Sequence, residues 1–358
     1  MLGSPATFTR RLLRWYDKCR RNLPWRPDPA AGRAGVDPYH VLVSEAMLQQ
    51  TQVATVIPYF NRFIERLPTL AALAAADEQE VLRLWQGLGY YSRARNLQAA
   101  ARQVVNEHGG ELPRDVDQLL KLPGVGRYTA GAVSSIAFGR RAPILDGNVL
   151  RVLCRVDKIT SDPRGRETQV LLWRRAEEIL PKARVGDFNS ALMELGATAC
   201  IPRTPQCLIC PVREHCEAFA AGAAERIPPP RKAKPTPLLE RSIYCIRSNG
   251  RWLLEQRPAT GRWASMWQFV TLTAGGAPAE QLPVRVKRAA RIGEVTHGLT
   301  HRRYRFDVHV CDACGDATAE ENRPRKWVTL EGLKEYPLPR PHLKVAQMLR
   351  DLSGKNGS

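Results

Sequence analysis

The sequence predicts a multidomain protein in which an all-α domain is followed by a smaller α+β domain. Up to about residue 225, apolar residues recur at the spacing of amphipathic helices. Residues 226–238 are rich in proline and basic side chains, a composition typical of a semi-rigid linker. Beyond them, apolar residues alternate with a period of two, which indicates strands. We therefore expect domains at residues 1–225 and 239–358, joined by this linker.

Local signals predict several helix boundaries in the first domain. Asp37-Pro38 combines a capping carboxylate with a proline in the first turn, so a helix is expected to begin there. Asp77 and Glu80 have the spacing of a capping box, and Gly109-Gly110 should stop the helix that begins near Ser92. Apolar residues at i, i+3, i+4 and i+7 predict a further helix that faces a core, through Val53, Val56, Ile57 and Phe60.

The composition favours a polyanionic partner. The 358 residues include 54 Lys+Arg against 35 Asp+Glu, a formal charge of +19. Nucleic acid is favoured over a membrane, because no segment approaches the ~20 apolar residues of a span and no signal peptide or anchor is recognised. An arginine-rich proteome would produce the same excess. The nine cysteines without a secretory signal indicate a reducing cytoplasm.

Four cysteines near the end of the first domain have the density of metal ligands. Cys200, Cys207, Cys210 and Cys216 follow a C-x6-C-x2-C-x5-C pattern. An all-sulfur set suits zinc or an iron–sulfur cluster. One close pair flanked by single cysteines favours one compact loop, residues 200–216, around a cubane cluster. The alternative is a set of four unrelated buried thiols.

A glycine turn lies upstream of the cysteines. Pro123-Gly124-Val125-Gly126 separates two short helical segments, the second a run of small residues from Thr129 to Phe138. Glycines allow backbone N–H groups to approach an anion such as a DNA phosphate, and a helix N-terminus attracts one. The alternative is a helix-ending turn without a ligand.

Two carboxylates have contrasting surroundings. Glu45 lies in a largely apolar helical segment, where burial should raise its pKa and make it a proton donor near neutral pH. Asp146 precedes the helix predicted at Gly147–Val156, where the helix dipole should lower its pKa. Such a pair can divide the acid and anion roles across a glycosidic bond. Taken singly, Asp146 could be a simple N-cap and Glu45 a salt-bridged core residue.

These motifs, in this order, resemble the adenine DNA glycosylases of the MutY type within the helix-hairpin-helix superfamily. The segments Ser44–Val53 and Gly87–Leu97 add to the match, which covers residues 8–220. The resemblance implies a repair enzyme that flips adenine out of double-stranded DNA and hydrolyses it when it is mispaired with 8-oxoguanine or guanine. It also implies a 4Fe–4S cluster on the four cysteines.

The resemblance also implies roles for individual residues. Glu45 would protonate adenine, and Asp146 would stabilise or capture the sugar cation, with Tyr128 and Asn148 completing the site. The expected base pocket consists of Arg21, Leu23, Trp25 and Ser190. Gln50 and Tyr90 would enter the helix beside 8-oxoguanine. The full set expected to contact DNA is Leu48, Gln50, Tyr90, Gly124, Val125, Gly126, Thr300 and His301.

Three positions bear on how this chain differs from its relatives. Tyr128 stands where the related endonuclease III enzymes carry a lysine, and a phenol cannot form a Schiff base, so base removal without efficient strand cleavage is expected. Ser190 stands where relatives often have Glu or Gln, so its contact with adenine would need a water. Asp28–Asp37 is longer than expected for the family and is predicted to be a surface loop.

The second domain resembles the Nudix fold that this family uses to read 8-oxoguanine. Trp252–Pro258 and Trp267–Phe269 match its opening strands. The stretch Gly275–Gly293 contains Glu280 but lacks the glutamate cluster that holds magnesium, so pyrophosphatase activity is not expected. The family's Phe-Ser-His reader appears as Leu299-Thr300-His301, in which threonine keeps the hydroxyl but leucine replaces the aromatic ring, unless His301 is an ordinary surface histidine. Strands are predicted at Ser242–Ile246, Trp252–Gln256 and Tyr304–Val310.

Other functions remain as alternatives. One is a helix-hairpin-helix glycosylase for thymine or uracil opposite guanine, which the Nudix-like domain disfavours. Another is a non-catalytic DNA-binding redox protein, which the presence of both Glu45 and Asp146 disfavours. Cys311 and Cys314 form a CxxC pair that is expected to be reduced thiols rather than a zinc site. We expect a monomer in the cytoplasm, associated with the nucleoid.

Overall fold

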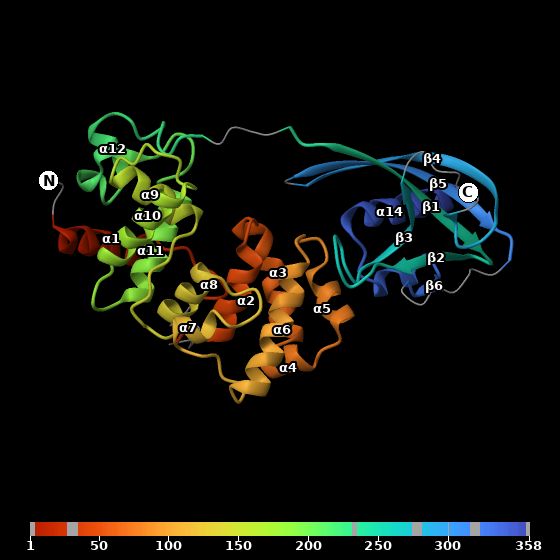
Figure 1. The fold of residues 1–358 in the computed structure, drawn as a ribbon, viewed down its shortest axis with the longest axis horizontal. Coiled ribbons are helices and arrows are strands. Elements are labelled where there is room, and N and C mark those ends of the chain that lie inside the picture. The colour runs from red at the N-terminus through yellow and green to blue at the C-terminus, as the bar shows by residue number, and fades with distance from the viewer. Residues whose placement is uncertain are drawn as a thin grey trace. The chain divides into compact units, whose positions relative to one another are not determined.

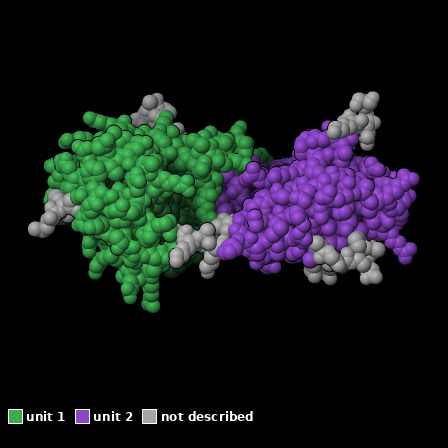
Figure 2. Space-filling model, turned by 90° about the horizontal axis from the view of Figure 1, so that it is seen from above, with its two compact units in different colours: residues 1–75, 96–232 green, residues 76–95, 233–358 purple. Residues whose placement is uncertain are grey.

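The computed structural model describes residues 4–26, 35–230, 235–273, 281–299, 301–315 and 323–355. The chain divides into two compact units (Figure 2). The first consists of Met1–Ala75 and Asn96–Lys232, and the second of Ala76–Arg95 and Ala233–Ser358. That residues 1–225 and 239–358 are separate folding domains remains a prediction. No helix within the described ranges is long and apolar enough to cross a membrane.

The first unit is built of helices, as predicted (Figure 1). The α-helices are α1 (Pro5–Cys19), α2 (Pro38–Leu48), α3 (Val53–Arg66), α4 (Leu70–Ala75), α6 (Ser92–Glu107, which begins in the second unit), α7 (Val116–Leu119), α8 (Arg127–Ala132), α9 (Gly147–Val156), α10 (Arg166–Glu178), α11 (Val185–Thr198) and α12 (Glu217–Ala220). Short turns are η2 (Val133–Ala137), η3 (Cys207–Ile209) and η4 (Arg213–His215).

The predicted helix boundaries are largely confirmed. The Asp37 carboxylate caps α2 by accepting a hydrogen bond from Tyr39 N at 2.8 Å. Gly110 N donates to Val104 O at 3.1 Å and so satisfies a carbonyl at the end of α6. Asp77 stands at the N-cap of α5 (Glu78–Trp85), but no side-chain hydrogen bond caps this helix, so the predicted capping box is not formed. The stripe on α3 is half confirmed: Val56 and Phe60 are buried, while Val53 and Ile57 are partly exposed.

The glycine turn joins α7 to α8 and makes a helical hairpin, as predicted. Gly124 has φ +75°, and an added Cβ would lie 2.6 Å from Asn96 Cβ, so both backbone conformation and space require glycine. The helix predicted for Thr129–Phe138 differs in form. It is α-helical only to Ala132 and continues as the π-helical turn η2. Such turns are rare and frequent at functional sites.

The second unit contains a six-stranded mixed sheet, so the predicted α+β architecture is confirmed. Its strands follow the order β4-β5-β1-β3-β2-β6, in which β1 and β5 are parallel and the other neighbours antiparallel. Each predicted strand is present. The strands are β1 (Leu238–Ser248), β2 (Arg251–Gln256), β3 (Trp267–Thr273), β4 (Val286–Leu299), β5 (Arg302–Ala313) and β6 (Arg325–Val328); η5 (Gly332–Glu335) and α14 (Arg340–Lys355) follow.

Alternation along β1 gives the sheet two apolar faces. Ile243 and Cys245 pack in one cluster with residues of α14, which lies against the sheet (Figure 1). Tyr244 and Ile246 pack in a second cluster on the other face. Because successive side chains of a strand point to opposite faces, one strand serves both cores.

Several predictions for the second domain fall at the limits of the described chain. Thr300, Glu280 and most of the loop Asp28–Asp37 lie outside the described residues. His301 is exposed in the turn between β4 and β5. Of the CxxC pair, Cys311 is buried and Cys314 is exposed. The choice between reduced thiols and zinc there stays a prediction.

Candidate active site

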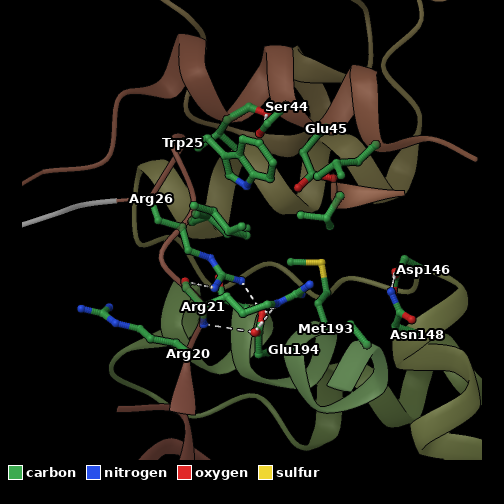
Figure 3. Close-up of a pocket in the computed structure, with 18 of the residues that line it drawn as sticks. Arg20, Arg21, Trp25, Arg26, Ser44, Glu45, Asp146, Asn148, Met193 and Glu194 are labelled. Atoms are coloured by element: carbon green, nitrogen blue, oxygen red, sulfur yellow. Dashed lines mark hydrogen bonds and ion pairs between the residues drawn. The ribbon is translucent and has the colours of Figure 1, made fainter. Parts of the chain in front are cut away.

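A cavity of about 480 Å³ lies within the first unit (Figure 3). It is bounded by α2, α8, α11, the start of α9 and the segment between α1 and α2. The residues expected to do the chemistry and those expected to hold the base all line it, although they are far apart in the sequence. They are Glu45, Tyr128, Asp146, Asn148, Arg21, Leu23, Trp25 and Ser190.

Glu45 has the properties expected of a general acid. Glu45 lies on α2, and only 5% of the residue is exposed. Burial raises the pKa of its carboxyl to about 7, although the hydrogen bond from Tyr128 acts in the opposite direction. Tyr128 Oη donates to Glu45 Oε2 at 2.6 Å and lies 3.2 Å from Met193 Sδ. The predicted rise of this pKa is confirmed, and a carboxyl with this pKa can donate a proton near neutral pH.

Asp146 is held by the first turn of α9. Its carboxylate accepts hydrogen bonds from Val149 N at 2.7 Å and Asn148 Nδ2 at 2.9 Å. The sequence predicted that the helix N-terminus would lower its pKa, and this is wrong. Burial raises the pKa of Asp146 and outweighs the hydrogen bonds and the charge of Arg151. Loss of hydration in the cavity therefore raises the pKa of Asp146 by more than the hydrogen bonds at the helix N-terminus lower it.

Arg151 connects Asn148 to the cysteine loop. Arg151 Nη2 donates to Asn148 Oδ1 at 2.9 Å and to Gly196 O at 2.7 Å. Its Nε donates to Cys200 O at 2.8 Å. Because the Asn148 carbonyl accepts from Arg151, its amide NH₂ is directed toward Asp146. A continuous set of hydrogen bonds thus runs from the cysteine loop to the Asp146 carboxylate.

Gly196 lets α11 approach α9 at this point, and we expect Gly196→Ala to impair the site. A Cβ at residue 196 would lie 2.5 Å from Asn148 Cβ and 2.9 Å from its Cα. The resulting shift should cost about 1–3 kcal/mol of stability and reduce the excision that the sequence resemblance implies, measured as thermal midpoint and single-turnover rate. Gly35→Ala, where nothing lies within 4 Å, is the control. Wild-type stability and excision in Gly196→Ala would contradict this account.

The sequence analysis missed Arg26 and Glu194, which also line the cavity. Arg26 directly follows Trp25, so it belongs to a segment already assigned to the base pocket. Glu194 lies four residues after Ser190 on α11, and therefore on the same helix face. A carboxylate in an apolar helix was the signal that singled out Glu45, and the same signal could have found Glu194.

The residues expected to contact DNA are not all at the cavity. Leu48 and Gln50 line it, whereas Tyr90, the hairpin glycines and His301 do not. Gln50 and Tyr90 are exposed and have φ of +56° and +47°. Non-glycine residues in this region are uncommon and occur often at functional sites. In the hairpin, Gly124 and Gly126 are exposed, and Val125 is buried.

The four cysteines lie together at the edge of the core of the first unit. Each is partly buried against that core. Burial raises the pKa of Cys210 to about 12, and electrostatic interactions with the other three thiols act in the same direction. No group of three or more His, Cys, Asp or Glu residues in the described part of the chain is arranged to hold a single metal ion. A cubane cluster differs, since each of its irons takes its own cysteine.

Arg155 makes this site suited to an anionic group. The residue is 2% exposed, and its guanidinium donates to Cys200 Sγ at 3.2 Å and to the carbonyls of Ile201, Pro202 and Ile227. A buried cation needs a nearby negative charge to offset its lost hydration. Four thiolates around an iron–sulfur cluster would supply one, so the residues present fit that group.

The fold and the cavity together define a helix-hairpin-helix DNA glycosylase of base-excision repair. Residues 43–178 match the HhH-GPD superfamily of base excision DNA repair proteins, and residues 242–348 match the NUDIX domain. Among solved structures, a thermostable thymine-DNA glycosylase is 31% identical with a TM-score of 0.54, covering 61% of this chain and 97% of that one. Endonuclease III in a non-covalent complex with DNA is 25% identical with a TM-score of 0.51, covering 62% and 98%.

Within this class the chain belongs to the adenine DNA glycosylase family. The adenine DNA glycosylase of Mus musculus is 38% identical over 97% of this chain and 78% of its own length. That of Homo sapiens is 39% identical over 91% and 71%, and that of Buchnera aphidicola subsp. Schizaphis graminum 31% over 96% and 99%. The prediction of a base-excision repair enzyme that removes mispaired adenine is confirmed, and neither alternative is favoured.

Proposed function

We propose that this enzyme removes adenine opposite 8-oxoguanine or guanine in double-stranded DNA, by hydrolysis and without an efficient strand-cleavage step. The observation that carries the proposal is a single cavity that is lined by both Glu45, with a pKa of about 7, and Asp146 (Figure 3). A cavity within the protein can receive a base only after it has left the helix, because the glycosidic bond is inaccessible inside the stack.

The residues around the flipped base have different roles in the reaction. Glu45 donates its proton to a ring nitrogen of adenine, so that the base leaves as a neutral molecule. The sugar develops positive charge as the bond breaks, and the Asp146 carboxylate stabilises it. Asn148 Nδ2 and Val149 N hold that carboxylate in place. Tyr128 Oη orients the acid through its hydrogen bond to Glu45.

Tyr128 also supports the absence of a strand-cleavage step. A lyase of this superfamily needs an amine at this position to form an imine with the opened sugar. The phenol instead donates to Glu45 at 2.6 Å, so it is committed to the acid. We propose that the reaction ends at the abasic site.

The opposite base would be read outside the cavity. Gln50 and Tyr90 are exposed, and both have the left-handed backbone conformation that is frequent at functional sites. We propose that these side chains enter the helix beside 8-oxoguanine, and that Thr300 and His301 of the Nudix-like domain contact the damaged base. The hairpin at Gly124–Gly126 would bind the DNA backbone.

Single-turnover excision from four duplexes tests the proposal. They would contain A opposite 8-oxoguanine, A opposite G, T opposite G, and U opposite G. We expect excision from the first two, and strand breaks only after alkali treatment. Efficient excision of T or U, or strand cleavage without alkali at the rate of excision, would contradict the proposed specificity or chemistry.

We further propose that Cys200, Cys207, Cys210 and Cys216 hold a 4Fe–4S cluster. When bound, the cluster supplies a rigid, charged centre around which the loop of residues 200–216 folds. The support is the all-cysteine donor set beside the buried guanidinium of Arg155. Through Arg151, the same loop reaches Asn148 of the active site.

Cys210→Ser should lose the cluster and, with it, stability and DNA affinity. We expect about four irons per chain in the wild type and substantially fewer in the variant, measured by iron analysis together with thermal midpoint and duplex binding. Cys314→Ser, at an exposed cysteine of the second unit, should keep its full iron content. A colourless, fully active wild-type protein that contains zinc would contradict the assignment.

A further inference from the structure

Glu194 forms the most completely buried ion-pair cluster of the cavity wall. Its side chain is 0% exposed. Glu194 Oε1 accepts from Arg21 Nε at 2.6 Å, and Oε2 accepts from Arg21 Nη2 at 3.1 Å and from Arg26 Nη2 at 2.8 Å. Oε1 also accepts from Arg21 N at 3.2 Å. One carboxylate thus fixes two guanidinium groups that lie 168 and 173 residues away in the sequence.

The two arginines are further constrained by each other and by an aromatic ring. Arg26 Nη1 donates to Arg21 O at 2.9 Å. The Arg26 guanidinium lies over the Tyr16 ring, 5.6 Å from its centroid. Only 14% of the Arg26 side chain is exposed, and both arginines line the cavity. Figure 3 shows this group across the cavity from Asp146. Their free N–H groups are therefore available to acceptor atoms of a base held there.

The charged groups around Glu45 come from several of the elements that line the cavity. Two guanidiniums share one carboxylate at Glu194, so this wall carries a net positive charge. Asp187 lies at the cavity too, but it pairs with Arg184 at 2.8 Å. Arg151 does not line the cavity, but its charge lowers the pKa of Asp146. The titratable and charged residues that line the cavity are Tyr16, Arg20, Arg21, Arg26, Glu45, Tyr128, Asp146, Asp187 and Glu194.

We propose that Glu194 is a positioning residue for adenine excision, which holds Arg21 and Arg26 against the cavity wall and shields Glu45 from the charge of Arg26. The proposal rests on the role of Glu45 as the acid. Glu194 contacts neither the reacting bond nor Glu45, so it acts through the two arginines. It would thereby determine both how the arginines bind the base and the pH at which Glu45 is protonated.

The shielding follows from the signs of the charges. Burial and Asp146 raise the pKa of Glu45, whereas the positive charge of Arg26 lowers it. Burial raises the pKa of Glu194 as well, but the hydrogen bonds from Arg21 and the charge and hydrogen bond of Arg26 outweigh burial and hold its pKa below the ordinary value. Glu194 is therefore ionised wherever Glu45 titrates. Loss of its charge leaves both guanidiniums unopposed, which favours the ionised form of Glu45.

The test is the pH dependence of single-turnover excision by Glu194→Gln on a duplex with A opposite 8-oxoguanine. The wild-type rate should fall as pH rises through about 7, since Glu45 must be protonated. In Glu194→Gln this midpoint should move to lower pH by about half a unit or more, which lowers the protonated fraction of Glu45 at pH 7.5 about threefold, and loss of the arginine contacts should lower the rate further at every pH. Glu177→Gln removes one surface carboxylate near Arg141 and should change neither quantity.

A compensating variant separates charge from folding. Arg26→Gln combined with Glu194→Gln removes one positive and one negative charge, so the net charge of the wall is that of the wild type. The midpoint should return toward the wild-type value, while the rate stays low because the arginine contacts are lost. Arg26→Gln alone should move the midpoint to higher pH, and this measurement does not depend on whether Glu194→Gln folds.

The outcomes distinguish this proposal from the assignment of Glu45. If the wild type shows a midpoint near neutral pH and the Glu194→Gln and Arg26→Gln variants leave it unmoved, Glu194 is merely structural and the inference fails. If the wild type has no such midpoint and Glu45→Gln still excises adenine, the assignment of Glu45 fails and the inference falls with it. Opposite shifts in the two single variants, reversed in the double variant, would support both.

Discussion

Glu45→Gln should abolish adenine excision while leaving duplex binding largely intact. Glutamine keeps the shape of the side chain and can still accept the hydrogen bond from Tyr128, but it cannot act as an acid. We expect the single-turnover rate to fall by about 10³-fold or more, since a positioned general acid contributes about 10²–10⁴. Duplex binding, measured by fluorescence anisotropy, should change little. Excision near the wild-type rate would remove Glu45 from the mechanism.

The pH dependence of the free energy of unfolding gives an independent measure of the Glu45 pKa. This pKa is raised by burial from an ordinary value of 4.5 to about 7, so the protonated form favours the folded state. This contribution is fully present below pH 4.5 and is lost as pH rises through about 7, an effect of roughly 3 kcal/mol. Glu45→Gln should not show this loss. The stability difference between wild type and variant should therefore grow between these pH values, as measured by denaturant unfolding.

Asp146→Asn should reduce excision by about 10²–10³-fold, the usual effect of removing one group that stabilises charge in a transition state. Asparagine is also a good N-cap, so it can still accept from Val149 N and keep the start of α9. The variant thus removes the negative charge that opposes the sugar cation and keeps the fold. Single-turnover rates and thermal midpoints would measure the two effects separately.

A matched substitution tests whether the effect of Asp146→Asn is chemical. Asp37 caps α2, the helix that carries Glu45, by accepting from Tyr39 N at 2.8 Å. Asp37→Asn makes the same chemical change at an N-cap residue that does not line the cavity and should leave excision unchanged. Equal losses in the two variants would mean that Asp146 acts only as a helix cap.

The sequence predicted the architecture because architecture depends on local patterns. Apolar periodicity of 3.6 and then of 2 distinguished the helical unit from the sheet. The N-caps at Asp37 and Asp146 and the glycine turn at Gly124 were predicted for the same reason, since each satisfies backbone groups within a few residues. The chemistry-bearing motifs were also contiguous, so the resemblance identified Glu45, Asp146 and Tyr128.

By itself, then, the sequence determined the order of helices and strands and the hairpin, and it named the candidate residues that the structure brings together at the cavity. Only the tertiary structure decided the pKa direction of Asp146 and the partnership of Glu194 with Arg21 and Arg26. Both depend on how much water the cavity excludes and on which charges meet across distant segments. A helix dipole can be read from neighbouring residues, whereas desolvation is a property of everything packed around a group, and for Asp146 desolvation is the larger effect.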